Sequence, residues 1–242
     1  MSVAMATYNG ERFVVEQMRS ILDELAPTDE LIVVDDASSD GTVGRIEALR
    51  DARVHVLVQD RNMGVRASFD RALRACRGCF VFLSDQDDRW RPGKRAALVE
   101  ALQRGALLAL SDARVIDAEG RVVEQSFMAR RGGFRGGALA TLVRNRYLGC
   151  AMAFRRELLE EALPIPERVP QHDMWIGMLA ALNGPVSYLP QPLIDYRRHA
   201  GNLSPGRRAS LGRMVAWRWR LVQLMALRRW RGRRPISNEG IA

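Results

Sequence analysis

The sequence has few cysteines, a single lysine and no long apolar run. Its three cysteines, Cys76, Cys79 and Cys150, are an odd number, which does not favour a disulfide framework. Cys76 and Cys79 have metal-ligand spacing, but no second pair completes a zinc site. We therefore expect reduced, structural thiols and an intracellular protein.

No run of about 18 uncharged apolar residues is present, so no membrane-spanning helix is predicted. The first ten residues, MSVAMATYNG, lack the basic and apolar regions of a secretory signal. Both absences predict a cytoplasmic location. The apolar content of 47% is sufficient for a large buried core.

The net charge of +9 is concentrated near the C-terminus, where residues 207–234 hold ten arginines and no acid. Lys94 is the only lysine of the chain. Apolar residues recur at three- and four-residue steps in 207–234, with tryptophans between arginines, which predicts a basic amphipathic helix. We expect it to attach the protein to an anionic membrane surface, at the inner face, rather than to nucleic acid. Packing of this helix on the domain is the alternative.

The first 112 residues alternate predicted strands and helices, which indicates an α/β fold with a mostly parallel sheet and helices on both faces. The predicted strands are 2–6, 30–34, 54–58, 80–83 and 106–110, and the helices are 11–25, 43–49, 65–76 and 94–103. Beyond residue 112 the alternation ends. There the pattern predicts a hairpin at 115–123, helices at 138–144, 156–163 and 174–182, and strands at 150–154, 186–189 and 193–196.

Acidic residues follow several predicted strands. Asp85, Asp87 and Asp88 come after strand 80–83, the pair Asp35-Asp36 ends strand 30–34, and Asp112 ends strand 106–110. Open α/β sheets bind ligands at this edge, and clustered carboxylates favour a cation such as Mg²⁺ or Mn²⁺. An acidic turn with helix caps is the alternative. The first turn, TYNGER, lacks the glycine pattern of dinucleotide-binding proteins.

Seven motifs in order resemble the family-2 glycosyltransferases, which have the GT-A fold. They are TYNG at 7–10, VVDDASSDGT at 33–42, RNMG at 61–64, SDQDD at 84–88, GCAMAFRREL at 149–158, QHD at 171–173 and YRRHAGNLS at 196–204. The stretches SDQDDRW and QHDMW are similar to the rhamnosyltransferase branch of that family. The resemblance divides the chain into a nucleotide-sugar-binding half (1–112), an acceptor-side half of the same domain (113–206) and the basic tail (207–242).

The resemblance also implies a nucleotide site. Asp36 would contact the nucleobase, and Thr7 and Tyr8 would line the same pocket. Asn62 and Gly64 would lie near the base and the ribose. Helix capping is the alternative for Asp36.

For the remaining site residues the resemblance implies a metal and a base. Asp85 would contact the ribose, Asp87 would bind the metal, and His199 would approach the metal or the diphosphate. Asp173 would be the catalytic base, although it could also cap the helix that follows. Asp88 either supports the metal site or caps the helix after Trp90. His172 is expected to pack, and the arginines of 130–135 either clamp a phosphate or are solvated.

The expected activity is an inverting, metal-dependent transfer of a sugar from a nucleotide-diphosphate donor, such as dTDP-rhamnose, to a cell-surface glycan or lipid-linked acceptor. A divalent cation would neutralise the departing diphosphate, and a carboxylate would deprotonate the acceptor hydroxyl. A nucleotidyltransferase is a rival, but the chain lacks a glycine- and basic-rich phosphate loop near its N-terminus. A noncatalytic nucleotide-sugar-binding protein is a second rival, which would tolerate loss of the Asp173 carboxylate.

Overall fold

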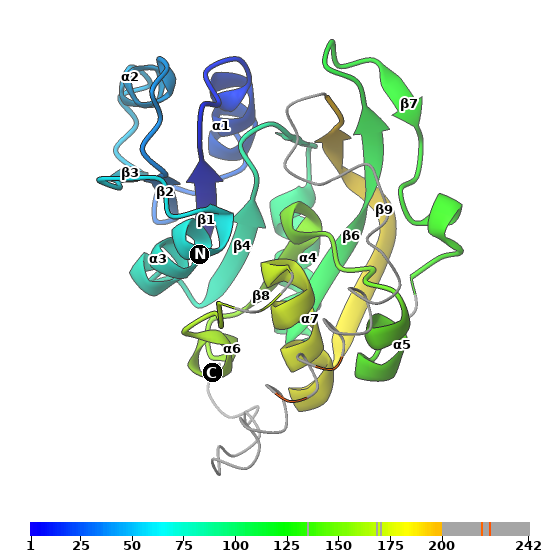
Figure 1. The fold of residues 1–242 in the computed structure, drawn as a ribbon. Coiled ribbons are helices and arrows are strands. Elements are labelled where there is room, and N and C mark those ends of the chain that lie inside the picture. The colour runs from blue at the N-terminus through cyan, green and yellow to red at the C-terminus, as the bar shows by residue number, and fades with distance from the viewer. Residues whose placement is uncertain (135, 168, 170, 200–218, 220–222, 224–242) are drawn as a thin grey trace.

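The computed structural model describes residues 1–134, 136–167, 169, 171–199, 219 and 223 (Figure 1). The predicted helix at 207–234 therefore lies outside the described residues, except for Trp219 and Gln223. Within the described part, nine strands form one sheet, with β3-β2-β1-β4-β8-β6-β9-β5 in order and β7 paired to β6. The part of the chain that is described contains no helix long and apolar enough to cross a membrane.

The first half of the sheet is parallel, as the sequence predicts. Strands β1 (Ser2–Thr7), β2 (Glu30–Asp35), β3 (Val54–Val58) and β4 (Phe80–Ser84) all run in one direction. Their carboxyl ends therefore meet at one edge, where the acidic loops after β2 and β4 begin.

Antiparallel strands enter the second half of the sheet. Strand β8 (Met152–Arg155) runs antiparallel between β4 and β6 (Leu108–Ile116), and β9 (Val186–Arg197) runs parallel to β6. The two short strands β5 (Arg89–Trp90) and β7 (Val122–Glu124) pair antiparallel with β9 and β6. This half places the end of β9 beside the loop that follows β4.

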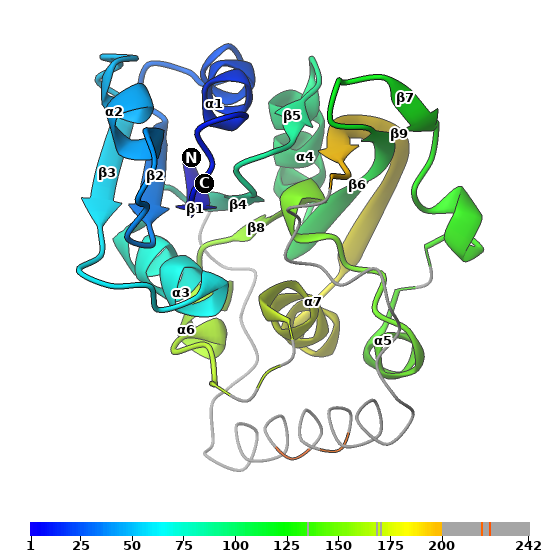
Figure 2. The same ribbon diagram turned by 45° about the horizontal axis from the view of Figure 1, so that its top comes forward.

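Helices cover both faces because strand residues alternate between two apolar clusters. One cluster joins Val3 and Met5 to helices α1 (Val14–Leu22), α2 (Thr42–Glu47) and α4 (Lys94–Gln103). The other joins Ala4 to α3 (Val65–Ala75), α6 (Leu158–Ala162) and α7 (His172–Asn183). Figure 2 shows these last three helices on the side of the sheet opposite α1 and α4.

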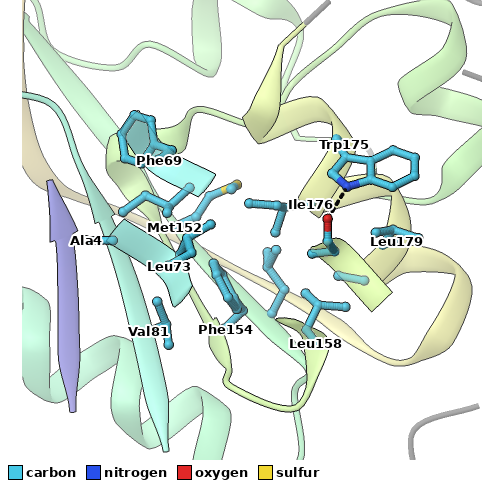
Figure 3. Close-up of a cluster of buried hydrophobic side chains, with 14 of the residues drawn as sticks. Ala4, Phe69, Leu73, Val81, Met152, Phe154, Leu158, Trp175, Ile176 and Leu179 are labelled. Carbon is cyan, nitrogen blue, oxygen red and sulfur yellow. Dashed lines mark hydrogen bonds between the residues drawn. The ribbon is translucent and has the colours of Figure 1, made fainter. Parts of the chain in front are cut away.

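The second cluster fixes α7, the helix that carries Asp173. Trp175 is fully buried among Leu158, Ile176 and Leu179, and its indole Nε1 donates to the Ala162 carbonyl at 2.9 Å (Figure 3). Three short helical segments complete the described fold: η1 (Ala129–Arg131), α5 (Ala138–Val143) and η2 (Gly149–Ala151).

The fold prediction is confirmed, and three of its details are corrected. Strand 106–110 does not end at Asp112, because β6 continues to Ile116 and buries Asp112 within it. The two strands predicted at 186–189 and 193–196 are one strand, β9. Strand β5 was not predicted.

Candidate active site

The loop after β2 is held to the first turn of the chain by Asp35. This buried carboxylate accepts hydrogen bonds from Thr7 Oγ1 at 2.9 Å and from Ser38 N and Oγ at 2.8 and 2.6 Å. Asn9 extends the link, since its Oδ1 accepts from Ser39 N at 2.9 Å. Asp35 is therefore structural, and it fixes the backbone from which Asp36 projects.

Asp36 does not cap a helix, because the N-cap of α2 is Gly41. Its Oδ1 accepts from Met63 N at 2.7 Å and Gln59 Nε2 at 2.6 Å, and its Oδ2 accepts from Gly64 N at 2.8 Å. The 61–64 loop is thereby drawn to the end of β2.

The other predicted nucleotide-site residues belong to two loops that contact Asp36, the first turn of the chain and the 61–64 loop. The Thr7 carbonyl accepts from Asp36 N at 2.8 Å. Tyr8 is 40% exposed in the first turn, and Asn62 is exposed in the 61–64 loop. Of these residues, Gly64 contacts the Asp36 carboxylate and Thr7 contacts the Asp36 backbone, while Tyr8 and Asn62 are their neighbours in the two loops.

Two glutamines that sequence reasoning missed connect this region to the acids after β4. Gln86 accepts from Tyr8 N at 2.8 Å and donates to the Tyr8 carbonyl at 3.0 Å. Gly10 makes room for it, since a Cβ there would lie 2.3 Å from Gln86 Oε1. Buried Gln17 on α1 donates to Ser84 Oγ at 2.8 Å and to the Asp85 carbonyl at 2.9 Å. These bonds orient the chain where β4 ends.

Three potential ligand groups, the Asp85 and Asp88 carboxylates and the Cys150 thiol, come within 4.8 Å of one another. Burial, together with the neighbouring acids, raises the pKa of Asp85 and that of Asp88 above their usual range. Oδ1 of Asp88 accepts a hydrogen bond from Arg197 N at 2.9 Å, which links the loop after β4 to the end of β9. Asp88 does not cap α4, because the N-cap of that helix is Gly93.

A buried lysine, Lys94, lies beside the Asp85, Asp88 and Cys150 side chains. Lys94 is completely buried, donates from Nζ to the Cys150 carbonyl at 2.5 Å and lies 4.1 Å from the centroid of the Trp90 ring. Burial lowers the pKa of Lys94 to about 7, while Cys150, Asp88 and Asp85 act in the opposite direction. Lys94 is therefore the basic member of this buried group of Asp85, Asp88 and Cys150.

Asp87 and His199 form a pair that is more exposed to solvent than Asp88 and Lys94. Asp87 Oδ2 lies 2.9 Å from His199 Nε2, and both side chains are 14–16% exposed. Arg197 holds this pair in place, because its Nε donates to the Asp87 carbonyl at 2.8 Å. Carboxylate oxygens and an imidazole that are partly open to solvent are a donor set that fits Mg²⁺ or Mn²⁺.

Asp173 lies in the first turn of α7. The N-cap of that helix is Gln171, so Asp173 is not the cap. Its Oδ1 accepts from Met174 N at 2.5 Å and Asn145 Nδ2 at 3.4 Å. A Cβ on Gly149 would lie 3.4 Å from Asp173 Cβ, so this glycine allows the close approach.

The environment of Asp173 suits a proton acceptor. Burial raises its pKa to about 6, although hydrogen bonds from Met174 N and other donors lower it. Its charge also raises the pKa of Asp85, which places both carboxylates in one electrostatic environment. The adjacent His172 packs against Phe69, with ring centroids 4.1 Å apart, and burial lowers its pKa to about 4. His172 is thus a neutral packing residue, as expected.

The sheet order, a parallel half followed by strands of mixed direction, is that of a GT-A fold. The family model "Glycosyl transferase family 2" matches residues 2–163, and the chain belongs to that family. It is 32% identical over 122 residues to the succinoglycan biosynthesis protein ExoO of Rhizobium meliloti, covering 50% of this chain and 35% of that protein.

A second relative is the Escherichia coli WfgD, named as a UDP-Glc:alpha-D-GlcNAc-diphosphoundecaprenol beta-1,3-glucosyltransferase. It is 31% identical over 94 residues, which cover 39% of this chain and 37% of that protein. The chain thus matches little more than a third of the length of either relative.

Solved structures share the fold over almost the whole chain. Staphylococcus aureus TarS 1–349 in complex with UDP-GlcNAc has a TM-score of 0.70 and 24% identity, covering 94% of this chain and 65% of that one. A mannosyltransferase from Pyrobaculum calidifontis in complex with GDP-Man and Mn²⁺ has a TM-score of 0.65 and 23% identity, covering 97% and 65%.

Proposed function

We propose that this chain is an inverting glycosyltransferase that moves a sugar from a nucleotide-diphosphate donor to a hydroxyl group of a glycan. The observation that carries this proposal is the convergence of Asp173, on α7, with the acids that follow β4. Such an arrangement provides a site for a diphosphate and, opposite it, a carboxylate that can accept a proton.

Asp173 is the proposed catalytic base. With a pKa of about 6 it is mostly ionised at neutral pH and still basic enough to take the proton of an attacking hydroxyl. A single base with direct attack by the acceptor inverts the anomeric carbon.

Asp87 and His199 are the residues proposed to hold a divalent cation, and Asp85 is proposed to contact the ribose. A bound Mg²⁺ or Mn²⁺ would supply positive charge to the departing diphosphate. The Mn²⁺ in the Pyrobaculum neighbour supports this choice of ion. Arg197 holds Asp87 and Asp88 in position, and Lys94 holds the Cys150 carbonyl beside them.

The nucleobase is proposed to lie against Asp36, with Thr7 and Tyr8 on one side and Asn62 and Gly64 on the other. The SDQDDRW and QHDMW stretches favour dTDP-rhamnose as the donor. The structural neighbours carry UDP-GlcNAc and GDP-Man, so these donors belong in the same test.

The acceptor is proposed to be a lipid-linked or cell-surface glycan. The acceptor in the printed name of WfgD, a sugar on diphosphoundecaprenol, supports this class. The basic segment 207–234 would then hold the enzyme at the anionic inner face of the membrane. Deletion of residues 207–242 should release the protein from anionic vesicles, and unchanged partitioning would refute this attachment.

The test of the activity is a panel of nucleotide sugars, including dTDP-rhamnose, UDP-GlcNAc and GDP-Man, incubated with Mn²⁺ or Mg²⁺. We expect slow hydrolytic release of one nucleoside diphosphate by the wild type. The Asp173→Asn variant should bind the same nucleotide but lose transfer. No binding and no turnover of any donor would refute the proposal, and full function of Asp173→Asn would favour a noncatalytic nucleotide-sugar-binding protein.

A further inference from the structure

Three arginines from separate segments gather beside the proposed active site. Arg131 belongs to η1, Arg144 follows α5, and Arg198 follows β9. Arg144 donates from a terminal nitrogen to the Arg131 carbonyl at 3.5 Å, and Arg198 donates to the Tyr196 hydroxyl at 3.2 Å. We name Arg131, Arg144 and Arg198 the arginine cluster.

An aromatic floor supports the cluster. The Arg131 guanidinium lies 3.6 Å from the centroid of the Phe127 ring, and Phe127 meets Tyr196 edge to face with centroids 5.6 Å apart. Burial lowers the pKa of Arg131, and the positive charges of Arg144 and Arg198 lower it further. The charges of Arg144 and Arg198 thus act on Arg131, while the Glu124 carboxylate acts on its pKa in the opposite direction.

No carboxylate forms an ion pair with the arginine cluster among the residues that the structure describes. Arg130, which precedes it in the same loop, does pair with Glu124. The segments that the structure does not describe include a single acidic residue in their sequence, Glu239. Gathered, unneutralised guanidinium groups bind phosphate well, because their planar forks match its oxygens.

Two members of the cluster are direct sequence neighbours of residues that contact the proposed site. Arg144 precedes Asn145, which donates to Asp173 at 3.4 Å. Arg198 precedes His199, which meets Asp87 at 2.9 Å. The backbone of the cluster is therefore tied to both the Asp173 and the Asp87 sides of the site, so a molecule whose anionic group the cluster holds is a candidate for the acceptor.

We propose that the arginine cluster binds the diphosphate of a lipid-linked acceptor sugar. This inference rests on the proposed glycosyltransferase function and deepens it by naming the charged part of the acceptor. The diphosphate of the donor has the same chemistry, so the experiment must separate the two sources.

The first measurement is calorimetric binding of inorganic pyrophosphate to the metal-free full-length protein. We expect Arg131→Gln and Arg144→Gln each to weaken this binding about tenfold, because each removes a charge-assisted hydrogen bond. Arg130→Gln is the matched control: it removes the same charge from the same loop, but its arginine is already paired with Glu124. Equal affinities in all three variants and the wild type would overturn the proposal.

The second measurement is the affinity for a nucleoside diphosphate in the presence of Mn²⁺, using whichever of UDP, GDP and dTDP binds most tightly. Arg131→Gln and Arg144→Gln should leave it within about twofold of the wild type. A parallel tenfold loss would assign the cluster to the donor and overturn the acceptor assignment. Failure of the glycosyltransferase proposal has a different signature: the wild type would release no nucleoside diphosphate from any donor, whatever the pyrophosphate result.

Discussion

Replacement of Asp173 by asparagine should abolish transfer and at the same time make the protein more stable at pH 8. Loss of a general base lowers the rate by about 10²–10⁴-fold. The oxygen of asparagine can still accept the hydrogen bonds from Met174 N and Asn145 Nδ2 that Asp173 accepts now. The geometry is therefore kept while the ionisable group is lost.

The stability change follows from the raised pKa. The pKa of Asp173 rises from 3.8 to about 6 on folding, so the folded state disfavours the charged form. This penalty is absent below about pH 3.8, grows as the pH rises and is fully present above the folded pKa. Two pKa units correspond to at most about 3 kcal/mol. Because the side chain is partly exposed, we expect asparagine to raise the free energy of unfolding by about 1–2 kcal/mol at pH 8, a gain that vanishes near pH 4.

The assay is urea or thermal unfolding of both proteins at pH 4 and pH 8, combined with the pH dependence of transfer. A gain of 1 kcal/mol raises Tm by about 2–4 °C for a chain of this size. The wild-type rate should increase with pH through about 6. If Asp173→Asn is destabilised at pH 8, or equally affected at both pH values, the electrostatic reasoning for Asp173 is wrong.

Asp195 provides a control, because its replacement by asparagine should change the free energy of unfolding in the opposite direction. It is 1% exposed, and although burial raises its pKa, hydrogen bonds from Arg114 at 2.7 Å and from Arg89 lower it more. The stabilisation is therefore present at neutral pH and lost as the pH falls. Asp195→Asn should destabilise the protein at pH 8, where Asp173→Asn stabilises it.

Three further predictions concern the site and its support. Asp87→Ala should weaken Mn²⁺ binding by at least about tenfold in calorimetry, and wild-type affinity would remove Asp87 from the metal site. Lys94→Met should lower the free energy of unfolding in urea by about 1–3 kcal/mol, because the buried Cys150 carbonyl would lose its hydrogen-bond donor; a near-native midpoint would contradict that role. Gly177→Ala should cost about 1–3 kcal/mol in the same assay, since its Cβ would lie 2.3 Å from Cγ of the Tyr147 ring, and an unchanged midpoint would show that the ring can move aside.

The parallel half of the fold could be predicted because its elements are defined by local periodicity. Strand β3 and helix α4 have the predicted bounds, since their apolar patterns end at clear breaks. The errors occur where distant contacts override such breaks. Asp112 resembles the end of a strand, but it accepts hydrogen bonds from Met128 N and Ser126 Oγ and is carried inside β6.

Strand β9 is a second case in which tertiary contacts prevail over a local signal in the sequence. Pro190 and Pro192 would normally divide a strand, because proline cannot donate to its neighbour. Here the register between β6 and β9 shifts near Asp112, opposite Pro192, and pairing resumes beyond it. The extra residues lie on β9, since the single step from Ser111 to Asp112 on β6 is matched by three steps on β9, from Leu189 to Pro192. The prolines therefore fall where β9 bulges, and the β6 partner that lets pairing resume is distant in sequence.

In the candidate site, the motifs indicated the segments that carry the site residues, but not the hydrogen bonds that join these segments. The links made by Gln17 and Gln86 depend on residues far apart in sequence, so no local pattern indicated them. Lys94 did leave a signal in the composition. The other 36 basic residues are arginines, and the one ammonium group occupies a buried space beside Trp90.

Because the chain has a single lysine, proteolysis at that residue can report local unfolding around α4. A protease specific for lysine can cleave only the bond between Lys94 and Arg95, which would yield fragments of 94 and 148 residues. That bond lies in the first turn of α4, and the lysine side chain is inaccessible until the helix detaches from the sheet. The rate at which two bands appear on a gel would therefore measure how often this layer separates in the native protein.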